Sequence, residues 1–524
     1  MRQSFIEGAE WADYSAELAR MEKLTKADVV TVANRYFGDD YVAVHQIDAQ
    51  HTLPSVAKPQ IDPVTIDPSR QSAFAAEILA MEFEPIEPSF IEADKDYRRI
   101  TFADGVELFY APNPLNDLFS LSISIDVGTE ENDKLSLAAA LMDVAGTEAL
   151  SNEALQKEWY RLGSSFNFGA SENASGFSLS GLDEQFEASL ELMMSAIKQP
   201  LTDDETLEQL KSILIKSRQD MKSSPPAIAR ALNLYNRYGE ESPMLESLTT
   251  EEIRATQLDE LLSLPSDLLD YEHTLAYTGS MPLEQVVEVL RRHHPLAGDL
   301  KQPPSYRFRT VREISTNEVY VVDQQTAQAQ VRIEFADGEY NADDRVPASV
   351  YTSYFGSGMS SVVFQELREA RALAYSASAR YGQGSRLKDQ NLMLGAIGTQ
   401  TDKTVDALDA FIDLIDNMPE SQERFEETVT ALLNRYRTSK LSFREVIGAV
   451  RGWEELGLEG DPRAESYARL QELEFADLVA FQREHVKDRA KLISIVGDLS
   501  IIDKTELERF GSVKEVAIDD LFVE

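Results

Sequence analysis

The sequence predicts an α+β protein made of two homologous domains, each a mainly antiparallel sheet with helices on one face. Three observations predict this class: strands that alternate apolar and polar side chains, amphipathic helices that follow them, and a constant spacing between two such series. Alternating strands are typical of antiparallel sheets with one solvated face. The chain has 524 residues, which is too long for one ordinary core.

The first repeated element is an alternating strand that ends in a glycine. FSLSISIDVG, Phe119 to Gly128, places its apolar side chains on one face and its serines and aspartate on the other. AQVRIEFADG, Ala329 to Gly338, has the same alternation. The closing glycines are offset by 210, from position 128 to position 338, and Gly146 and Gly356 share this offset. The sequence therefore predicts the same strand once in each domain.

The second repeated element is a strand of small residues followed by an amphipathic helix. FSLSGL starts at Phe177 and LMLGAI starts at Leu392. The apolar faces of the two helices consist of Phe186, Leu190, Met193 and Ile197, and of Val405, Leu408, Ile412 and Ile415. The two series predict domains at residues 95–300 and 301–524. MKSSPPAIAR, Met221 to Arg230, predicts a break between two long helices that close the first domain.

A helix, a short turn, a strand and a glycine close each domain. The copy at Phe475 to Asp498 matches Leu258 to Ser280 at an offset of 218, and Lys26 to Asp48 at an offset of 449. Pro265 predicts that the helix of the middle copy is shortened or bent. Residues 1–50 therefore hold only the closing helix and strand of a further, upstream domain, and we expect that the functional unit does not begin at Met1.

Residues 51–94 connect this closing element to the first domain. They are rich in proline and acidic residues, as in TLPSVAKPQIDPVTIDP, and predict an extended linker with one short helix at Ser72 to Met81. A lone helix and strand bury too little surface to stand alone. We therefore expect either that the chain is a fragment or that a separate polypeptide completes residues 1–50.

Composition excludes several classes of function. The net charge is −41, so the chain lacks the basic surface that nucleic-acid binding needs. There is no cysteine, which excludes disulfides, thiolate metal sites and thiol nucleophiles. The sequence contains no run of eighteen apolar residues, so it predicts no membrane span. The first residues, MRQSFIEGAEWADYS, lack the layout of a signal peptide, which leaves the compartment open between the cell envelope and the cytoplasm.

One stretch of the chain resembles a known family. FGSGMSSVVFQELREARALAYSASARY, Phe355 to Tyr381, is similar to a signature of the non-catalytic half of the insulinase/pitrilysin-type zinc peptidases, the inverzincins. The duplicated domains, the linker and the closing pattern are similar too, so the resemblance covers nearly the whole chain. It implies the processing-peptidase/LuxS-like metallohydrolase fold and a chamber that encloses peptides. Ala372 is a departure, because the family often has glycine there.

The resemblance implies roles for two residues. Arg368 would bind a backbone carbonyl or a carboxylate of the substrate with its planar fork of donors. Tyr375 would donate a hydrogen bond to the oxyanion of the tetrahedral intermediate, and both would act on a zinc site held elsewhere. From the residues alone, an arginine beside Glu369 is most often a solvated ion-pair partner and a strand tyrosine most often a packing residue, so these interpretations of Arg368 and Tyr375 stay open.

The family also has a zinc motif, H-x-x-E-H, in which two histidines bind the metal and the glutamate activates water. The six histidines of this chain form that spacing in neither direction. The matching slot, LSLAAALMDVAGT from Leu135 to Thr147, has alanine, leucine and methionine where ligands would sit. His293 and His294 point about 100° apart on a helix and predict a solvated helix end. We expect no metal or other cofactor in this chain, and zinc in a complementary half.

The resemblance leaves two functions open. In the first, the chain is the non-catalytic half of a zinc-dependent endopeptidase, its partner is an HxxEH-bearing half in cis or in trans, and its substrates are peptides. In the second, it is a catalytically dead relative that acts as a scaffold or peptide-binding subunit. In either case we expect the chain alone to be inactive, and whether it is part of an enzyme depends on that partner.

Overall fold

The computed structural model describes residues 2–45, 72–82, 84, 86–296 and 298–524. The chain divides into two compact units, Met1–Phe83 and Glu84–Glu524. Within the described ranges, no helix is both long enough and apolar enough to span a bilayer.

Short helices make up the first unit: α1 (Arg2–Ile6), α2 (Trp11–Ser15), α3 (Glu17–Met21), α4 (Lys26–Tyr36) and α5 (Ala73–Leu79). α4 begins at a capping box between Thr25 and Asp28, and α5 is the short helix expected in the linker. The strand expected after α4 is not formed over residues 41–45, and Gln46 to Asp48 lie outside the described residues. A strand needs a neighbour for its hydrogen bonds, and the described part of this unit offers none.

The first six-stranded sheet belongs to the second unit and has the order β1-β2-β8-β3-β6-β5. Its strands are β1 (Arg98–Ala103), β2 (Val106–Pro112), β3 (Leu118–Ile125), β5 (Ser165–Ala170), β6 (Ser175–Leu182) and β8 (His273–Gly279). Neighbouring strands are antiparallel except for β2 and β8. β3 is the alternating strand that the sequence predicts, since its buried and more exposed side chains alternate.

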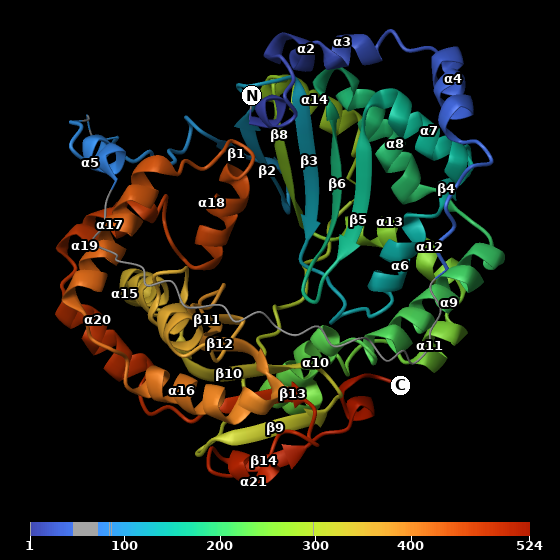
Figure 1. The fold of residues 1–524 in the computed structure, drawn as a ribbon. Coiled ribbons are helices and arrows are strands. Elements are labelled where there is room, and N and C mark those ends of the chain that lie inside the picture. Colours follow the sequence, from blue (N-terminus) through green and yellow to red (C-terminus); the bar gives the residue numbers. More distant parts are fainter. Residues whose placement is uncertain (1, 46–71, 83, 85, 297) are drawn as a thin grey trace. The chain divides into compact units, whose positions relative to one another are not determined.

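The second six-stranded sheet has the order β11-β12-β10-β13-β9-β14. Its strands are β9 (Glu318–Asp323), β10 (Gln328–Glu339), β11 (Ser376–Gly382), β12 (Gln390–Gln400), β13 (Leu492–Gly497) and β14 (Ser512–Glu515). β13 is parallel to β9 and antiparallel to β10, just as β8 is parallel to β2 and antiparallel to β3. The closing strands therefore occupy the same place in both sheets, and the predicted duplication is confirmed (Figure 1).

The helices of each domain cover one face of its own sheet. α8 buries the whole face that the sequence predicts, whereas on α16 Leu408 and Ile415 are buried and Val405 and Ile412 are half-buried. With the first sheet lie α6 (Leu135–Met142), α7 (Asn152–Leu162), α8 (Phe186–Lys198), α9 (Asp204–Met221), α11 (Thr250–Ala255), α12 (Leu258–Leu262), α13 (Leu264–Asp267) and α14 (Leu283–His293), together with the short pair β4 (Gly146–Thr147) and β7 (Pro200–Leu201). With the second lie α15 (Arg345–Tyr351), α16 (Thr404–Asp416), α17 (Gln422–Thr438), α19 (Arg463–Glu472), α20 (Phe475–Phe481) and α21 (Lys504–Leu507). The closing helix is divided at Ser263 into α12 and α13, and Pro265 lies in the first turn of α13, so the helix is shortened as predicted.

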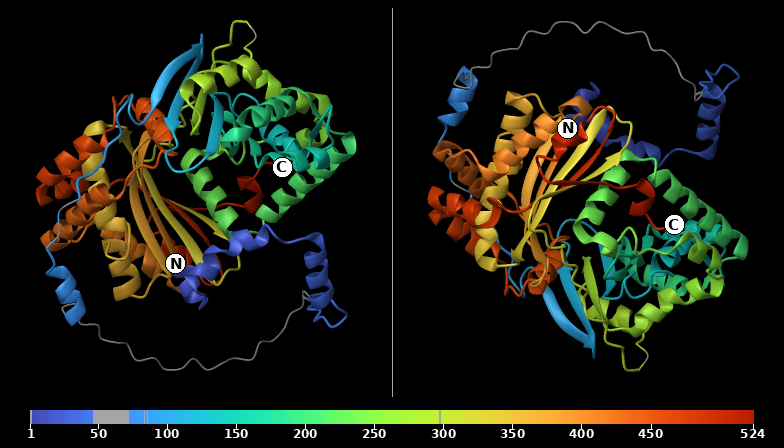
Figure 2. Two further views of the ribbon diagram at one scale, coloured as in Figure 1. Left: turned by 90° about the horizontal axis from the view of Figure 1, so that it is seen from above. Right: turned by 90° about the horizontal axis from the view of Figure 1, so that it is seen from below.

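Two helices pack across from one sheet to the other. α10 (Pro225–Tyr238) follows the expected break after α9, but it packs with Val322 and Val496 of the second sheet. α18 (Val446–Glu455) packs in return against Phe109 and Ala111 of the first. In Figure 2 the second sheet lies between its own helices, in orange, and the green α10. The prediction that α10 closes the first domain is wrong, because an apolar helix face does not specify which sheet it meets.

Candidate functional site

The segment that carries Arg368 is fixed to the second sheet by close packing. Gly356 lies so near β11 that a Cβ atom there would be 1.9 Å from the carbonyl oxygen of Ala379. Leu367, on the π-helical segment Phe364–Ala370, is fully buried in the core beneath it. Arg368 follows Leu367 directly and its side chain is 43% exposed. The buried leucine thus anchors the segment and leaves the arginine at its open side.

Ala372 ends this segment with a left-handed turn. Its φ is +49°, a region in which side chains other than glycine are uncommon. The amide of Leu373 donates to the carbonyl of Leu367 at 2.9 Å, one residue longer than the bond that closes an α-helix with a left-handed residue, in keeping with the π-helical winding of the segment. The position where the family often has glycine is therefore a position whose backbone favours glycine. The turn brings the chain back so that Tyr375 precedes β11.

Arg368 and Tyr375 lie side by side. The Arg368 guanidinium carbon is 4.7 Å from the ring centroid of Phe364 and 6.0 Å from that of Tyr375. Tyr375 is 75% exposed, and its amide donates to the carbonyl of Gly398 at 2.9 Å. Arg368 Nε lies 3.7 Å from Glu369 Oε1, so the two form the exposed ion pair that the sequence left open, although the distance is too long for a hydrogen bond. Among the described residues neither the Tyr375 hydroxyl nor the Arg368 guanidinium forms a hydrogen bond, and both side chains are exposed, so their donors are available to a ligand.

The slot that would hold the family's zinc ligands is an apolar helix. α6 buries Leu135, Leu137, Ala138, Leu141 and Met142. None of these side chains can coordinate zinc, so the residues do not fit the metal. Across the described ranges, no three histidine, cysteine, aspartate or glutamate side chains cluster in a way that could hold a metal ion.

His294 is buried, which corrects the prediction of a solvated helix end. Only 2% of it is exposed, and its Nε2 lies 2.8 Å from Nε2 of His273 on β8. His273 Nδ1 lies 2.7 Å from the carbonyl oxygen of Tyr271, so Nδ1 donates and Nε2 must accept from His294. His294 Nδ1 is then a bare, buried acceptor without a partner. Burial, helped by His273 and Lys198, lowers the pKa of His294 to about 3.

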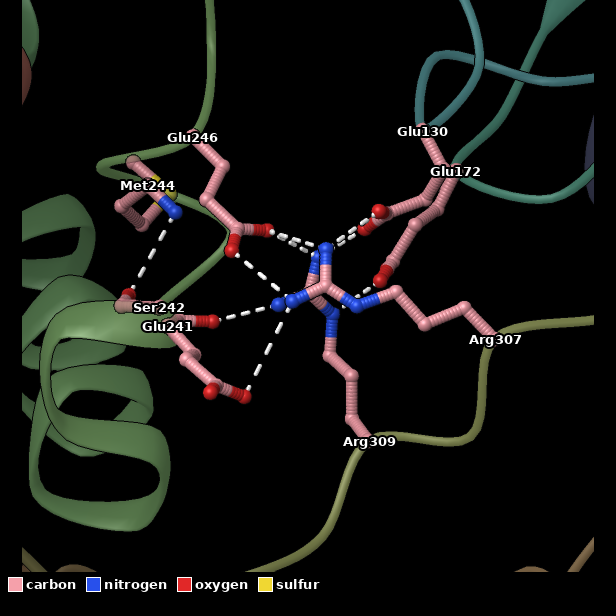
Figure 3. Close-up of polar contacts among 8 residues, drawn as sticks. All are labelled: Glu130, Glu172, Glu241, Ser242, Met244, Glu246, Arg307 and Arg309. Carbon is pink, nitrogen blue, oxygen red and sulfur yellow. Dashed lines mark hydrogen bonds and ion pairs between the residues drawn. The ribbon is translucent and has the colours of Figure 1, made fainter.

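A cluster of charged residues that no sequence pattern indicates joins the segment after Lys301 to the first sheet's loops (Figure 3). The side chain of Arg309 is 8% exposed and bonds the carboxylates of Glu130, Glu172 and Glu246. Arg307 bonds Glu130 at 2.5 Å and Glu246 at 3.1 Å. Burial alone would raise the pKa of Glu130, but the hydrogen bond from Arg307 and the charge of Arg309 outweigh it and lower that pKa.

Comparisons of sequence point to one family. The family model described as the peptidase M16 inactive domain matches residues 273–432. An uncharacterized zinc protease of Streptomyces coelicolor is 24% identical over 249 residues, which are 46% of this chain and 53% of that protein. The uncharacterized zinc protease YmxG of Bacillus subtilis is 22% identical over 309 residues, 56% of this chain and 72% of that protein. The match to the first relative thus covers about half of that protein's length.

Solved structures share the fold. The peptidase M16 inactive domain from Pseudomonas fluorescens superposes with a TM-score of 0.62 at 16% identity, over 77% of this chain and 98% of that one. The periplasmic protease PqqL from Escherichia coli superposes with a TM-score of 0.60 at 14% identity, over 92% of this chain and 52% of that one. Residues 273–432 thus match the peptidase M16 inactive domain, as the resemblance to the insulinase/pitrilysin-type family predicts, and the chain shares the fold of solved M16 structures.

Proposed function

We propose that this chain is the non-catalytic half of a zinc-dependent endopeptidase. It forms part of the wall of a chamber that encloses peptide substrates, and the complementary half supplies the metal and the bond cleavage. The observation that carries the proposal is the placement of Arg368 beside Tyr375, both exposed, within the segment that matches the M16 inactive domain. Because both side chains are exposed, both can contact a ligand at the surface.

The chemistry of the two groups suits a peptide undergoing cleavage. The guanidinium of Arg368 offers parallel donors that match a carbonyl or carboxylate oxygen of the peptide. The hydroxyl of Tyr375 can donate to the oxygen on which negative charge develops. Neither residue is a nucleophile or a base for this reaction, so they bind and stabilise but do not cleave. The proposal therefore requires a second set of residues outside this chain.

The first unit supports the need for a complementary half. Val29, Val32, Phe37, Val42 and Val44 of the closing element are each at least half exposed. In the matching copies the strand is central and paired on both sides, and β13 is buried along its whole length. We propose that residues 41–45 take the same central place in a sheet of the HxxEH-bearing half, in cis or in trans. Burial there would remove this apolar surface from water.

Reconstitution tests the function. The chain is mixed or co-expressed with an HxxEH-bearing M16 half from the same organism, and cleavage of an internally quenched peptide is followed with and without a zinc chelator. We expect chelator-sensitive turnover from the two halves together and none from this chain alone. Turnover by this chain alone, or an HxxEH half that is equally active without it, would contradict the proposal.

A second candidate function rests on the same exposed pair. A scaffold or peptide-binding subunit would use Arg368 to hold a peptide but would have no use for a donor to a developing charge. Fluorescence anisotropy with a labelled peptide separates the two. Peptide binding that depends on Arg368, with no turnover in any combination of halves, favours the subunit over the enzyme half.

A further inference from the structure

A buried threonine of the second sheet holds the turn that leads from Arg368 to Tyr375. Thr399 lies near the end of β12, and only 1% of it is exposed. Its hydroxyl donates to the carbonyl oxygen of Leu373 at 2.6 Å. Leu373 directly follows the left-handed Ala372 and lies two residues before Tyr375. The side chain of Thr399 is therefore bonded to the short stretch of chain that sets where Tyr375 lies.

Both backbone groups of Leu373 are bonded. Its amide donates to the carbonyl of Leu367 at 2.9 Å, which ties it to the π-helical segment, and its carbonyl accepts from Thr399, which ties it to the sheet. The amide of Tyr375 in turn donates to the carbonyl of Gly398 at 2.9 Å. Two consecutive residues of β12, Gly398 and Thr399, thus hold the backbone at and just before Tyr375.

β12 is a rigid support for this backbone. It lies between β11 and β10 and pairs with both, and Thr399 is opposite the fully buried Ala329 of β10. The Tyr375 side chain, in contrast, is 75% exposed, and its hydroxyl forms no hydrogen bond within the described part of the chain. The place of that hydroxyl therefore depends mainly on where the backbone holds Tyr375, and a site is more precise when a rigid element holds it.

We propose that Thr399 is a positioning residue for Tyr375 and acts through the carbonyl of Leu373. The inference rests on the proposed function, because the position of Tyr375 affects turnover only if its hydroxyl serves the developing charge. A misplacement of about 1 Å can cost roughly 10²-fold in rate. Without the threonine hydroxyl the Leu373 carbonyl loses its donor and the turn loses its tie to β12. Thr399 itself is too deeply buried to touch a substrate.

Thr399→Val tests this role in the reconstituted enzyme, since valine keeps the shape of threonine and removes the hydroxyl. We expect kcat to fall roughly tenfold with little change in KM, because the donor to the transition state is displaced and the binding groups remain. Thr399→Ser keeps a hydroxyl and should restore most of kcat. Adding Thr399→Val to Tyr375→Phe should lower kcat no further, since the hydroxyl to be positioned is already absent.

Thr401→Val is the matched control. Thr401 is also a buried threonine, 4% exposed, and its hydroxyl donates at 2.8 Å to the carbonyl of Thr326, which lies between β9 and β10 and not in the Tyr375 turn. This variant loses the same kind of bond, so it should lose similar stability toward urea while kcat stays at the wild-type value. An equal fall of kcat in both variants would show a general loss of stability and overturn the inference.

Hydrogen exchange tests the positioning on this chain alone. The amides of Leu373 and Tyr375 should exchange faster in Thr399→Val than in the wild type or in Thr401→Val. Thr399→Ala, which also lacks the hydroxyl, replaces the valine variant if that one does not fold. Unchanged exchange at Tyr375, full kcat without the hydroxyl, or an additive loss in the double variant would each overturn the role of Thr399. A normal kcat in Tyr375→Phe would instead refute the proposed role of Tyr375, so the two failures are distinct.

Discussion

The guanidinium carbon of Arg368 lies 6.0 Å from the ring centroid of Tyr375, at the outer range of a cation–π contact. The two side chains are seven positions apart in the sequence and meet because the chain reverses at Ala372. Both remain exposed to solvent. A peptide that reaches one of them therefore comes within reach of the other, which is why we assign them to one site.

Loss of the Tyr375 hydroxyl should act on turnover. In the reconstituted enzyme, Tyr375→Phe should lower kcat by roughly 10²–10³-fold with little change in KM, since the lost donor serves developing charge. Steady-state kinetics with the quenched peptide measure this. Tyr160→Phe removes the hydroxyl of a tyrosine that is 89% exposed on α7 and should change neither constant. An unchanged kcat in Tyr375→Phe would remove the proposed role.

Arg368 should instead act on binding. Arg368→Gln should weaken peptide binding roughly tenfold, because a charge-assisted hydrogen bond to the peptide is replaced by a weaker one. Anisotropy with the labelled peptide measures the affinity of this chain directly, without the other half. Arg371→Gln, three residues along and also part-exposed, is the matched control and should bind as the wild type does. Equal affinities for Arg368→Gln and the wild type would exclude Arg368 from the site.

Replacing Ala372 by the residue that the family often has should stabilise the turn. At φ +49° alanine is strained, so Ala372→Gly should gain up to about 1 kcal/mol locally, in spite of the greater freedom of glycine in the unfolded chain. Hydrogen exchange of the Leu373 amide, which closes the turn, should slow. Ala370 lies two residues earlier, where the backbone is not left-handed. Ala370→Gly should therefore destabilise the protein, by about 0.5–1 kcal/mol. Faster exchange in Ala372→Gly would show that the turn is not strained.

Local patterns in the sequence predict much of this fold. The alternating strands, the two amphipathic helices and the broken closing helix at Pro265 each follow from residues that are neighbours along the chain. The offset of 210 between Gly146 and Gly356 predicts the duplication. The structure explains why both positions are glycine, because a Cβ atom at either one would collide with backbone atoms. The family resemblance then brings Arg368 and Tyr375 into the same site.

Contacts between distant segments are what the sequence does not reveal. Nothing local indicates that α10 covers the second sheet, or that His273 and His294 bond each other across twenty-one positions. A histidine at a helix end beside two arginines has the composition of a solvated terminus, and only the packing of β8 makes it buried.

The charged cluster of Figure 3 predicts unequal roles for its two arginines. Arg309 is 8% exposed and Arg307 is 42% exposed, while both bond Glu130 and Glu246. Arg309→Met removes a buried cation from three carboxylates, of which Glu172 keeps no arginine and Glu130 and Glu246 keep only Arg307, and should lower the free energy of unfolding by about 2–3 kcal/mol. Arg307→Met, the matched control, should lower it by no more than about 1 kcal/mol. Urea denaturation measures both, and equal losses would mean that burial of the Arg309 pairs is unimportant.

The buried histidine pair should make the protein sensitive to acid. The folded pKa of His294 is about 3, whereas a histidine in an unfolded chain titrates near 6.5, so protonation favours the unfolded state. The stabilising contribution is complete above pH 6.5 and is lost as the pH falls from there toward 3, at up to about 1.4 kcal/mol per pH unit. Burial lowers the pKa of His273 as well, so the two should not both become charged in the folded state.

His294→Gln isolates this effect. The glutamine amide can still donate to Nε2 of His273 but does not titrate, so the pairing survives and the proton site is lost. We expect the variant to be about as stable as the wild type or somewhat less stable at pH 7.5, and to lose less of its unfolding free energy between pH 6.5 and pH 4.5. Urea denaturation at each pH gives the slope of unfolding free energy against pH for the wild type and for the variant. Parallel slopes would mean that His294 takes up its proton as readily in the folded protein as in the unfolded chain, and that its buried Nδ1 is open to water.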